Sequence, residues 1–317
     1  MTRVLIVGVG RMGFAHAVAA SKIQGVEICG LVARNFKKYE KEVATFPGAQ
    51  LYHDFKTALK KSKPDAVIIS TYTDTHALYA TLAMEAGAHV FVEKPLGLTR
   101  REAGYSIAMA RKTGKKLVVG YILRHHAIWK KFVECAKKLT GPYQVKITSN
   151  QYSTGAEWEL HKNILKAGLS PLTDCGIHYV DIMNQIARGD VIDIKAKGHK
   201  DDPEFPVVND ARMTVSYEDG SELYFESGFG PKIYPGEIPI RQVITKDGEV
   251  TITPHNQIIF NGEEIHFDKD AYDKSLDAQQ RFFFNAIEKD INLEQHWISV
   301  AMSHAICFVA EEEMEIY

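Results

Sequence analysis

Asp174 and His178 lie four residues apart in the largely apolar segment SPLTDCGIHYVDIM, residues 170–183. Residues i and i+4 share a helix face, so a helix here would make the carboxylate and the imidazole neighbours. Ionisable groups among apolar residues are costly unless they are paired or used. A histidine titrates near neutral pH and can take a proton from a hydroxyl group, while an aspartate can orient the ring or bind a second hydroxyl. Gly176 leaves room for a ring to approach. Alternatively, Asp174 and His178 only form a hydrogen bond with each other and have a structural role.

Lys94 is a second side chain that could take part in a reaction, because it follows the apolar run HVFV within residues 89–95. Such a run is typical of a parallel strand buried on both faces. Ligands of open α/β sheets bind outside the carboxyl ends of the strands, so a lysine there is directed into the crevice. Its ammonium could stabilise a developing alkoxide, or relay a proton if burial lowers its pKa. The alternative is a strand-end lysine that merely reaches solvent.

The motif GVGRMG places three glycines in G-x-G-x-x-G spacing between an apolar strand-like run and a helical pattern. The first glycine permits a tight turn, the second lets backbone approach a pyrophosphate, and the third lets the helix pack close to the strand. The N-terminus of the helix then offers N–H groups to the phosphates. The pattern predicts a dinucleotide site at Gly8, Gly10, Arg11, Met12 and Gly13. Glycines that only build a turn are the alternative.

The end of the second expected strand bears on the choice of cofactor. An acidic residue there would bind the ribose 2′-hydroxyl of NAD. The chain instead has Ala33, Arg34 and Asn35. A guanidinium can bind a 2′-phosphate through two hydrogen bonds, so the sequence favours NADP(H), with NAD(H) still possible. Arg34 could instead be a solvated loop residue that stacks on adenine.

These residues require a scaffold, and the first third of the chain supplies one by alternating strand and helix patterns. Six buried strands separated by helical segments predict right-handed crossovers and a doubly wound parallel Rossmann sheet in the order 3-2-1-4-5-6. The expected strands are residues 3–10, 26–34, 49–53, 64–71, 89–95 and 116–122. We expect this dinucleotide-binding domain to occupy residues 1–121.

From residue 122 onward the pattern changes to strands with one polar face. Turn signals at Asp219-Gly220, Asp247-Gly248 and Asn261-Gly262 indicate hairpins. Together with a helix over residues 174–187, they predict an α+β domain with an open, mainly antiparallel sheet. We expect this substrate-binding and oligomerisation domain to span residues 122–317 and to end in two helices.

Composition excludes several classes of protein. A net charge of −2 over 317 residues gives no basic field for nucleic acid, and no apolar run is long enough for a membrane span. The N-terminus lacks a signal-peptide pattern. Cys29, Cys135, Cys175 and Cys307 have no disulfide-framework or zinc-site spacing, so no metal is expected. A soluble cytoplasmic protein without nucleic-acid or membrane partners is predicted.

The motifs GVGRMG, EKP, GYILR and DCGIH, in this order over most of the chain, resemble the Gfo/Idh/MocA family of oxidoreductases. The resemblance implies a Rossmann domain, an open antiparallel sheet used for dimer or tetramer contacts, and catalytic roles for Lys94, Asp174 and His178. Two stretches depart from the family pattern. AGLSP replaces a glycine-rich loop before Asp174, and STYTDTH differs from the family turn at Tyr72 and Thr73.

Further site residues are expected, some from the resemblance and some from their positions in the chain. Cofactor contacts beyond the glycine motif and residues 33–35 are expected at Ser70, Thr71, Thr73, His76, Glu93, Lys94 and Arg124. Substrate contacts are expected, with scaffold or surface roles as the alternative, at Tyr121, Tyr152, Trp158, Lys162 and Asp181.

The predicted function is an NAD(P)-dependent oxidoreductase that transfers a hydride between nicotinamide and a secondary hydroxyl or ketone of a sugar, sugar derivative or cyclitol. Two alternatives stay open. One is a redox-assisted glycosidase or lyase that holds its dinucleotide tightly, and the other is a non-catalytic nucleotide-sensing regulator. A homodimer or homotetramer is the expected assembly.

Overall fold

The computed structural model describes residues 1–234, 236–267 and 271–317, and only the backbone of residues 271–273. The chain divides into two compact units. Unit 1 comprises Met1–Ile122 and Tyr272–Ile298, and unit 2 comprises Leu123–Ala271 and Ser299–Tyr317. In the described ranges, none of the helices has the length and apolar character that a bilayer crossing needs.

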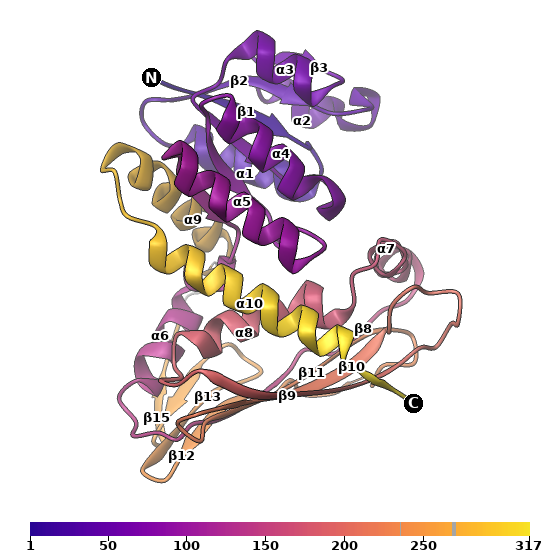
Figure 1. Ribbon diagram of the computed structural model, residues 1–317, viewed down its shortest axis with the longest axis vertical. Coiled ribbons are helices and arrows are strands. Elements are labelled where there is room, and N and C mark those ends of the chain that lie inside the picture. The colour runs from indigo at the N-terminus through magenta and orange to yellow at the C-terminus, as the bar shows by residue number, and fades with distance from the viewer. Residues whose placement is uncertain (235, 268–270) are drawn as a thin grey trace. The chain divides into compact units, whose positions relative to one another are not determined.

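Unit 1 is built on a six-stranded parallel sheet in the order β3-β2-β1-β4-β5-β6, which confirms the predicted Rossmann topology (Figure 1). Its strands are β1 Thr2–Val7, β2 Val26–Val32, β3 Gln50–Tyr52, β4 Ala66–Ile69, β5 His89–Val92 and β6 Leu117–Val119. Every residue of β4 is 0% exposed. Such complete burial follows from helices that cover both faces of a parallel sheet.

The helices of unit 1 are α1 Arg11–Ser21, α2 Glu40–Ala44, α3 Phe55–Ser62, α4 His76–Glu85, α5 Arg100–Thr113 and α9 Ala271–Glu288. Of these, α5 begins and ends at residues suited to those positions. The Thr99 hydroxyl accepts a hydrogen bond from Glu102 N at the start of α5, and Gly114, with φ +66°, ends it. Short 3-10 turns, η1 Phe36–Tyr39 and η2 Thr73–Thr75, follow β2 and β4.

Residues 272–298 belong to unit 1, whereas the sequence predicts a second domain that spans residues 122–317. Phe283 of α9 is 0% exposed, and its ring centroid lies 6.0 Å from that of Phe91 in β5. An amphipathic pattern predicts that one helix face is buried, but it does not specify which sheet covers that face. The boundary between the units falls inside α10 Glu294–Glu312.

Unit 2 contains a large mixed sheet, mainly antiparallel as predicted, in the order β15-β14-β13-β12-β7-β11-β10-β9-β16, with β8 paired to β11. Its strands are β7 Gln144–Thr148, β8 Gln151–Tyr152, β9 Val191–His199, β10 Asp210–Tyr217, β11 Glu222–Gly230, β12 Arg241–Thr245, β13 Gly248–Ile252, β14 Ile258–Phe260, β15 Glu263–Ile265 and β16 Glu315–Ile316. Parallel pairing occurs between β7 and β11, β8 and β11, and β16 and β9.

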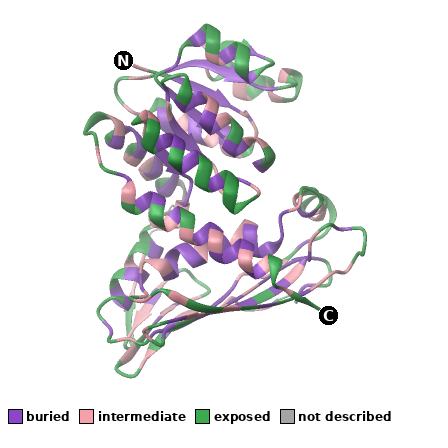
Figure 2. Ribbon diagram, viewed as in Figure 1, coloured by how far each residue is buried: buried purple, intermediate pink, exposed green. Residues whose placement is uncertain are grey.

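The helices α6 Ala127–Ala136 and α8 Ile177–Asn184 pack on one face of this sheet, and a third helix, α7 Gly155–Lys166, packs against β11 (Figure 1). Burial alternates along β10, as expected for a strand with one covered face and one open face (Figure 2). The predicted helix over residues 174–187 is not uniform. It begins as a π-helical turn, Leu172–Gly176, and continues as α8 only to Asn184.

Candidate functional site

The glycine motif of unit 1 forms a tight turn between β1 and α1. Gly8 has φ +89°, and a Cβ there would lie 2.5 Å from the carbonyl oxygen of Ser70. A Cβ on Gly13 would lie only 1.8 Å from the carbonyl oxygen of Gly8. These two positions therefore require glycine for packing within the protein itself.

Gly10 differs from the other two glycines. It has an extended conformation, φ −67° and ψ −176°, and a Cβ built on it meets nothing within 4 Å in the described part of the chain. It is the N-cap of α1, and no described side chain caps that helix end. Arg11 is exposed and Met12 half-buried. This open helix N-terminus suits a phosphate group, because its N–H groups and dipole favour an anion.

The three residues after β2 have different environments. Ala33 is buried, with its N–H bonded to Tyr52 O at 3.1 Å, and the Asn35 side chain accepts a hydrogen bond from Lys37 N at 3.1 Å to cap η1. Arg34 is exposed, and its guanidinium carbon lies 5.9 Å from the ring centroid of Tyr72. Of the three, Arg34 alone presents an exposed charged group at this strand end.

The turn after β4 holds four of the predicted cofactor contacts. Thr71 Oγ1 lies 2.7 Å from Thr75 Oγ1, and Thr73 is 9% exposed. Ser70 Oγ is buried and has no hydrogen-bond partner in the described residues. His76 is 2% exposed, with Nδ1 2.8 Å from Pro95 O and Nε2 3.1 Å from Thr71 O. His76 thus links this turn to the turn after β5, and burial lowers its pKa.

The residues after β5 are held from the interior of unit 1. Glu93 Oε1 lies 2.7 Å from Nε2 of the fully buried His16, and Glu93 Oε2 accepts a hydrogen bond from Lys94 N at 3.1 Å. The Lys94 side chain itself is half-buried. Tyr121, just after β6, is 1% exposed. Sequence reasoning missed His16, because a lone histidine in an apolar helix is indistinguishable from an ordinary core residue.

Asp174 and His178 belong to unit 2, where both are half-buried. Asp174 lies in the π-helical turn, and its N–H bonds to Ser170 O at 2.9 Å. π-Turns inside α-helices are frequent at functional sites. The turn is anchored by Glu311 of α10, whose carboxylate accepts hydrogen bonds from the hydroxyls of Ser170 and Thr173.

The expectation that Gly176 leaves room for an approaching ring needs a correction. A Cβ at Gly176 would lie 2.9 Å from Cε1 of Phe225, a residue of β11 that is 0% exposed. The space is therefore occupied by the protein's own aromatic ring, and Gly176 lets the helix pack closely on the sheet.

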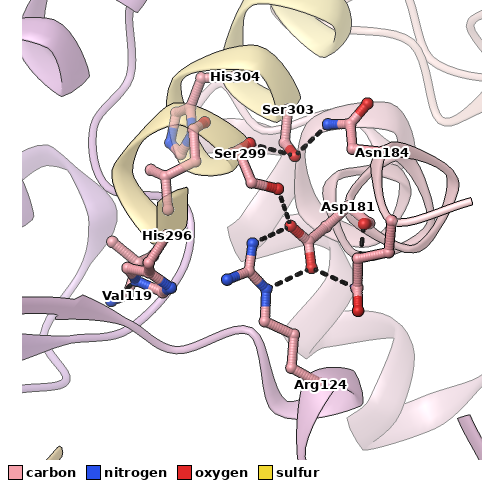
Figure 3. A network of polar contacts seen from close by, with 10 residues as sticks. Val119, Arg124, Asp181, Asn184, His296, Ser299, Ser303 and His304 are labelled. Atoms are coloured by element: carbon pink, nitrogen blue, oxygen red, sulfur yellow. Dashed lines mark hydrogen bonds and ion pairs between the residues drawn. The ribbon is translucent and has the colours of Figure 1, made fainter. Parts of the chain in front are cut away.

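Two of the predicted ligand contacts bind each other. Arg124 donates from Nε to Asp181 Oδ2 at 2.7 Å and from Nη2 to Asp181 Oδ1 (Figure 3). Ser299 Oγ donates to Oδ1 of the same carboxylate at 2.8 Å. The Asp181 side chain is 1% exposed and that of Arg124 is 18% exposed. Asp181 thus lies in a buried network that ties α8 to the 3-10 turn η3 Ile122–Arg124 and to α10.

The remaining predicted substrate residues lie on or before α7 in unit 2. Tyr152 is 47% exposed. The Trp158 ring packs edge-on against buried Phe205, with centroids 6.0 Å apart. Lys162 pairs with Glu159, and its amine lies 5.8 Å from the Trp158 ring centroid.

His161 of α7 is another residue that sequence reasoning missed. It is 5% exposed, is stacked on Phe229 and lies with Nδ1 2.8 Å from Ser153 Oγ. Burial lowers its pKa, and the negative charges of Glu157 and Asp174 oppose that shift.

The strand order, the glycine turn and the open N-terminus of α1 place the protein in the Rossmann class of dinucleotide-binding folds. The model of the oxidoreductase family Gfo/Idh/MocA with NAD-binding Rossmann fold matches residues 2–121, and that of the family's C-terminal domain matches residues 135–235. The chain belongs to the Gfo/Idh/MocA family, as the sequence motifs indicated.

Relatives in this family differ in activity. The scyllo-inositol 2-dehydrogenase (NAD(+)) of Bacillus subtilis is 26% identical over 232 residues, which cover 71% of this chain and 64% of that protein. The glycosyl hydrolase family 109 protein 2 of Akkermansia muciniphila is 35% identical over 124 residues, which cover 36% of this chain and 26% of that protein. The chain therefore spans less than two thirds of the length of these relatives.

The structure of UDP-N-acetylglucosamine 3-dehydrogenase GnnA from Acidithiobacillus ferrooxidans is similar over nearly its whole length. The TM-score is 0.82 at 20% sequence identity, with 99% of this chain and 98% of that one covered. At this identity the likeness establishes the shared fold.

Proposed function

We propose that the protein is an NADP(H)-preferring dehydrogenase or reductase that acts on a secondary hydroxyl or ketone of a sugar, sugar derivative or cyclitol. The observation that carries the proposal is the half-buried Lys94 at the carboxyl end of β5, the sheet edge where ligands of this fold bind. Membership of an oxidoreductase family and the activities of the inositol and UDP-sugar dehydrogenases support it.

The residues of unit 1 fit a dinucleotide. The open backbone at Gly10 and the N-terminus of α1 would hold the pyrophosphate, and Arg34 would hold a 2′-phosphate. The buried Ser70 hydroxyl beside the glycine turn, which has no hydrogen-bond partner among the described residues, would gain an acceptor from the ligand. When bound, the nicotinamide supplies the hydride acceptor or donor.

Three side chains would handle the substrate. Lys94 holds the reacting oxygen and stabilises its negative charge as the proton leaves. His178 takes that proton, because an imidazole titrates near neutral pH. Asp174, which precedes His178 by about one helical turn, binds a neighbouring hydroxyl. This assignment requires that Lys94 of unit 1 and the pair of unit 2 act on one substrate.

The direct test is incubation with NADP⁺ or NAD⁺ and a panel of inositols, aldoses and UDP-sugars, with the absorbance of the reduced cofactor as the readout. Lys94→Ala should lower kcat by about 100-fold or more while the Kd for NADP⁺ changes by less than about threefold. Lys112→Ala, which removes an exposed lysine in the last turn of α5, is the matched control and should retain full activity. A Lys94→Ala variant as active as the parent would exclude the proposed site.

The likeness to a glycosyl hydrolase family 109 protein favours one alternative, a redox-assisted glycosidase. This function predicts that the purified protein carries a tightly held dinucleotide and cleaves nitrophenyl glycosides with no net reduction of added NADP⁺. Mass spectrometry of the denatured protein identifies the bound nucleotide. Polyol-dependent reduction of free NADP⁺ without glycoside cleavage would reject this alternative.

We further propose assembly into a dimer or tetramer through the open face of the sheet in unit 2. This face carries a shallow groove of about 310 Å³ whose lining includes Lys146, Tyr224 and Ile244. Ile244 is 45% exposed there, while its neighbour Val243 is 0% exposed on the covered face. Light scattering should give a mass of two or four chains, which Ile244→Lys should lower toward one.

A further inference from the structure

His16 and Glu93 form a buried polar pair in unit 1 that is not accounted for by the fold alone. His16 lies on α1, and its side chain is 0% exposed. Its Nε2 is 2.7 Å from Oε1 of Glu93, whose side chain is 14% exposed. Burial of two ionisable groups costs free energy unless each is paired. A buried pair of this kind is therefore a candidate for positioning a neighbouring functional residue.

The carboxylate of Glu93 occupies a space that the absence of a side chain at Gly120 leaves open. Gly120, just after β6, would place a Cβ 3.2 Å from both Cδ and Oε2 of Glu93, so a larger residue there would press on the carboxylate. The second oxygen, Oε2, accepts the N–H of Lys94 at 3.1 Å. The carboxylate therefore connects the imidazole of His16 to the backbone of Lys94.

Gln280 of α9 contacts the other side of the ring. Its Nε2 lies 3.0 Å from His16 Nδ1, so Nδ1 accepts and Nε2 of His16 donates to Glu93. Gln280 Oε1 is buried without a hydrogen-bond partner in the described residues. Side chains from two other segments of the chain therefore hold both ring nitrogens of His16.

Aromatic side chains also pack near the pair. The ring centroid of Phe91 lies 4.7 Å from that of His16, and Phe283 lies behind Phe91. The charged or titratable groups near the carboxylate include His16 from α1, Lys94 itself and His76 from α4, whose electrostatic interactions involve both Glu93 and Lys94.

We propose that His16 is a positioning residue for Lys94: its ring N–H holds the Glu93 carboxylate, and through that carboxylate it fixes the backbone from which the amine projects. The inference rests on the proposed catalytic role of Lys94. In His16→Leu the carboxylate loses its interior partner and turns toward the Lys94 ammonium, which stabilises the charged amine.

The test measures Lys94 directly, without any substrate. The protein is labelled with trace acetic anhydride over a range of pH, and acetylation of the Lys94 peptide is quantified by mass spectrometry. His16→Leu should move the midpoint of Lys94 labelling upward by about one pH unit. His16→Gln, which keeps an N–H donor toward Glu93, should restore most of the parent value. His89→Leu, at the other end of β5, is the control for lost stability and should leave the midpoint unchanged.

Kinetics with a substrate from the panel gives the second readout. His16→Leu should lower kcat by about 10- to 100-fold, shift its pH profile in the same direction as the labelling midpoint, and change KM by less than about threefold. An unchanged midpoint and pH profile in a folded His16→Leu protein would overturn the inference. An inactive Lys94→Ala together with that result would leave the proposed function standing, whereas an active Lys94→Ala would remove the function itself.

Discussion

Asp181 binds Arg124 through both carboxylate oxygens, inside unit 2, with Arg124 Nε 2.7 Å from Oδ2 and Ser299 Oγ 2.8 Å from Oδ1. Gln185 Nε2 adds a contact to Oδ2 at 3.3 Å. Because the Asp181 side chain is 1% exposed, removal of the carboxylate would leave a largely buried guanidinium without its counter-ion. This arrangement favours a structural role for two residues that the sequence placed among the ligand contacts.

We expect Asp181→Ala to lower the free energy of unfolding by about 3–5 kcal/mol, because a buried charge loses its partner. Urea denaturation monitored by circular dichroism measures the loss. Asp193→Ala, which removes an exposed carboxylate paired with Lys195, is the control and should cost less than about 1 kcal/mol. A fully stable Asp181→Ala protein that loses substrate binding would instead place Asp181 in the ligand site.

The two glycines Gly10 and Gly13 should respond differently to alanine. Gly13→Ala puts a methyl group 1.8 Å from the Gly8 carbonyl oxygen, so we expect a loss of about 3 kcal/mol or more in unfolding free energy. Gly10→Ala meets no described atom within 4 Å and should keep stability within about 1 kcal/mol. Its methyl group would instead obstruct the pyrophosphate and raise the Kd for NADP⁺ at least about tenfold.

Fluorescence titration of each variant with NADP⁺, alongside its thermal unfolding, separates these effects. Equal affinities of Gly10→Ala and the parent protein for NADP⁺ would argue against a cofactor at this turn.

The Rossmann sheet could be predicted because its signals are local. Parallel strands buried on both faces appear as continuous apolar runs, and residues 66–69 are an example in which all four are 0% exposed. The glycine spacing also indicated a tight turn between the first strand and the first helix. Gly8 and Gly13 illustrate it, because a Cβ at either position would collide with a backbone carbonyl oxygen. The strand order then followed from the doubly wound topology that is typical of this glycine turn and strand–helix alternation.

The features that the sequence did not reveal depend on partners distant in the chain. The π-helical turn at Leu172–Gly176 fits Gly176 against Phe225, which lies about 50 positions further along the sequence. His16, Glu93 and Gln280 come from three separate segments, so no spacing rule connects them. Likewise, the motif that suggested a ligand role for Arg124 contains no sign that Asp181 takes up its guanidinium.

Arg34 should determine the preference between the two dinucleotides. We expect Arg34→Ala to raise the Kd for NADP⁺ by about 10- to 100-fold and to leave that for NAD⁺ within about threefold, because a charge-assisted pair to the 2′-phosphate is lost. Arg34→Lys should be intermediate, since an ammonium cannot form the paired hydrogen bonds of a guanidinium. Tyr72→Leu removes the ring 5.9 Å from the guanidinium and should weaken NADP⁺ binding by about threefold.

Isothermal titration calorimetry with both nucleotides gives the ratio of affinities directly. Equal losses for NADP⁺ and NAD⁺ in Arg34→Ala would mean that the guanidinium stacks on adenine.

His304 in α10 should make unit 2 sensitive to acid. It is 1% exposed, with Nδ1 2.8 Å from Val300 O, and burial lowers its pKa from 6.5 to about 4. Between about pH 6.5 and pH 4 the unfolded chain therefore binds a proton that the folded chain does not, and stability falls as the pH falls. For this one group the loss from about pH 7 to about pH 5 is about 2 kcal/mol. His304→Leu should make the decline in unfolding free energy over that range shallower by this amount.

Phe308→Leu is the matched control, because its ring lies 6.0 Å from that of His304 and does not titrate. It should lower stability by a similar amount at every pH in the range and keep the parent's slope. Urea denaturation at a series of pH values, followed by circular dichroism, measures all three slopes. If His304→Leu and Phe308→Leu have the same slope, the imidazole takes up its proton in the folded protein and its burial does not oppose the charge.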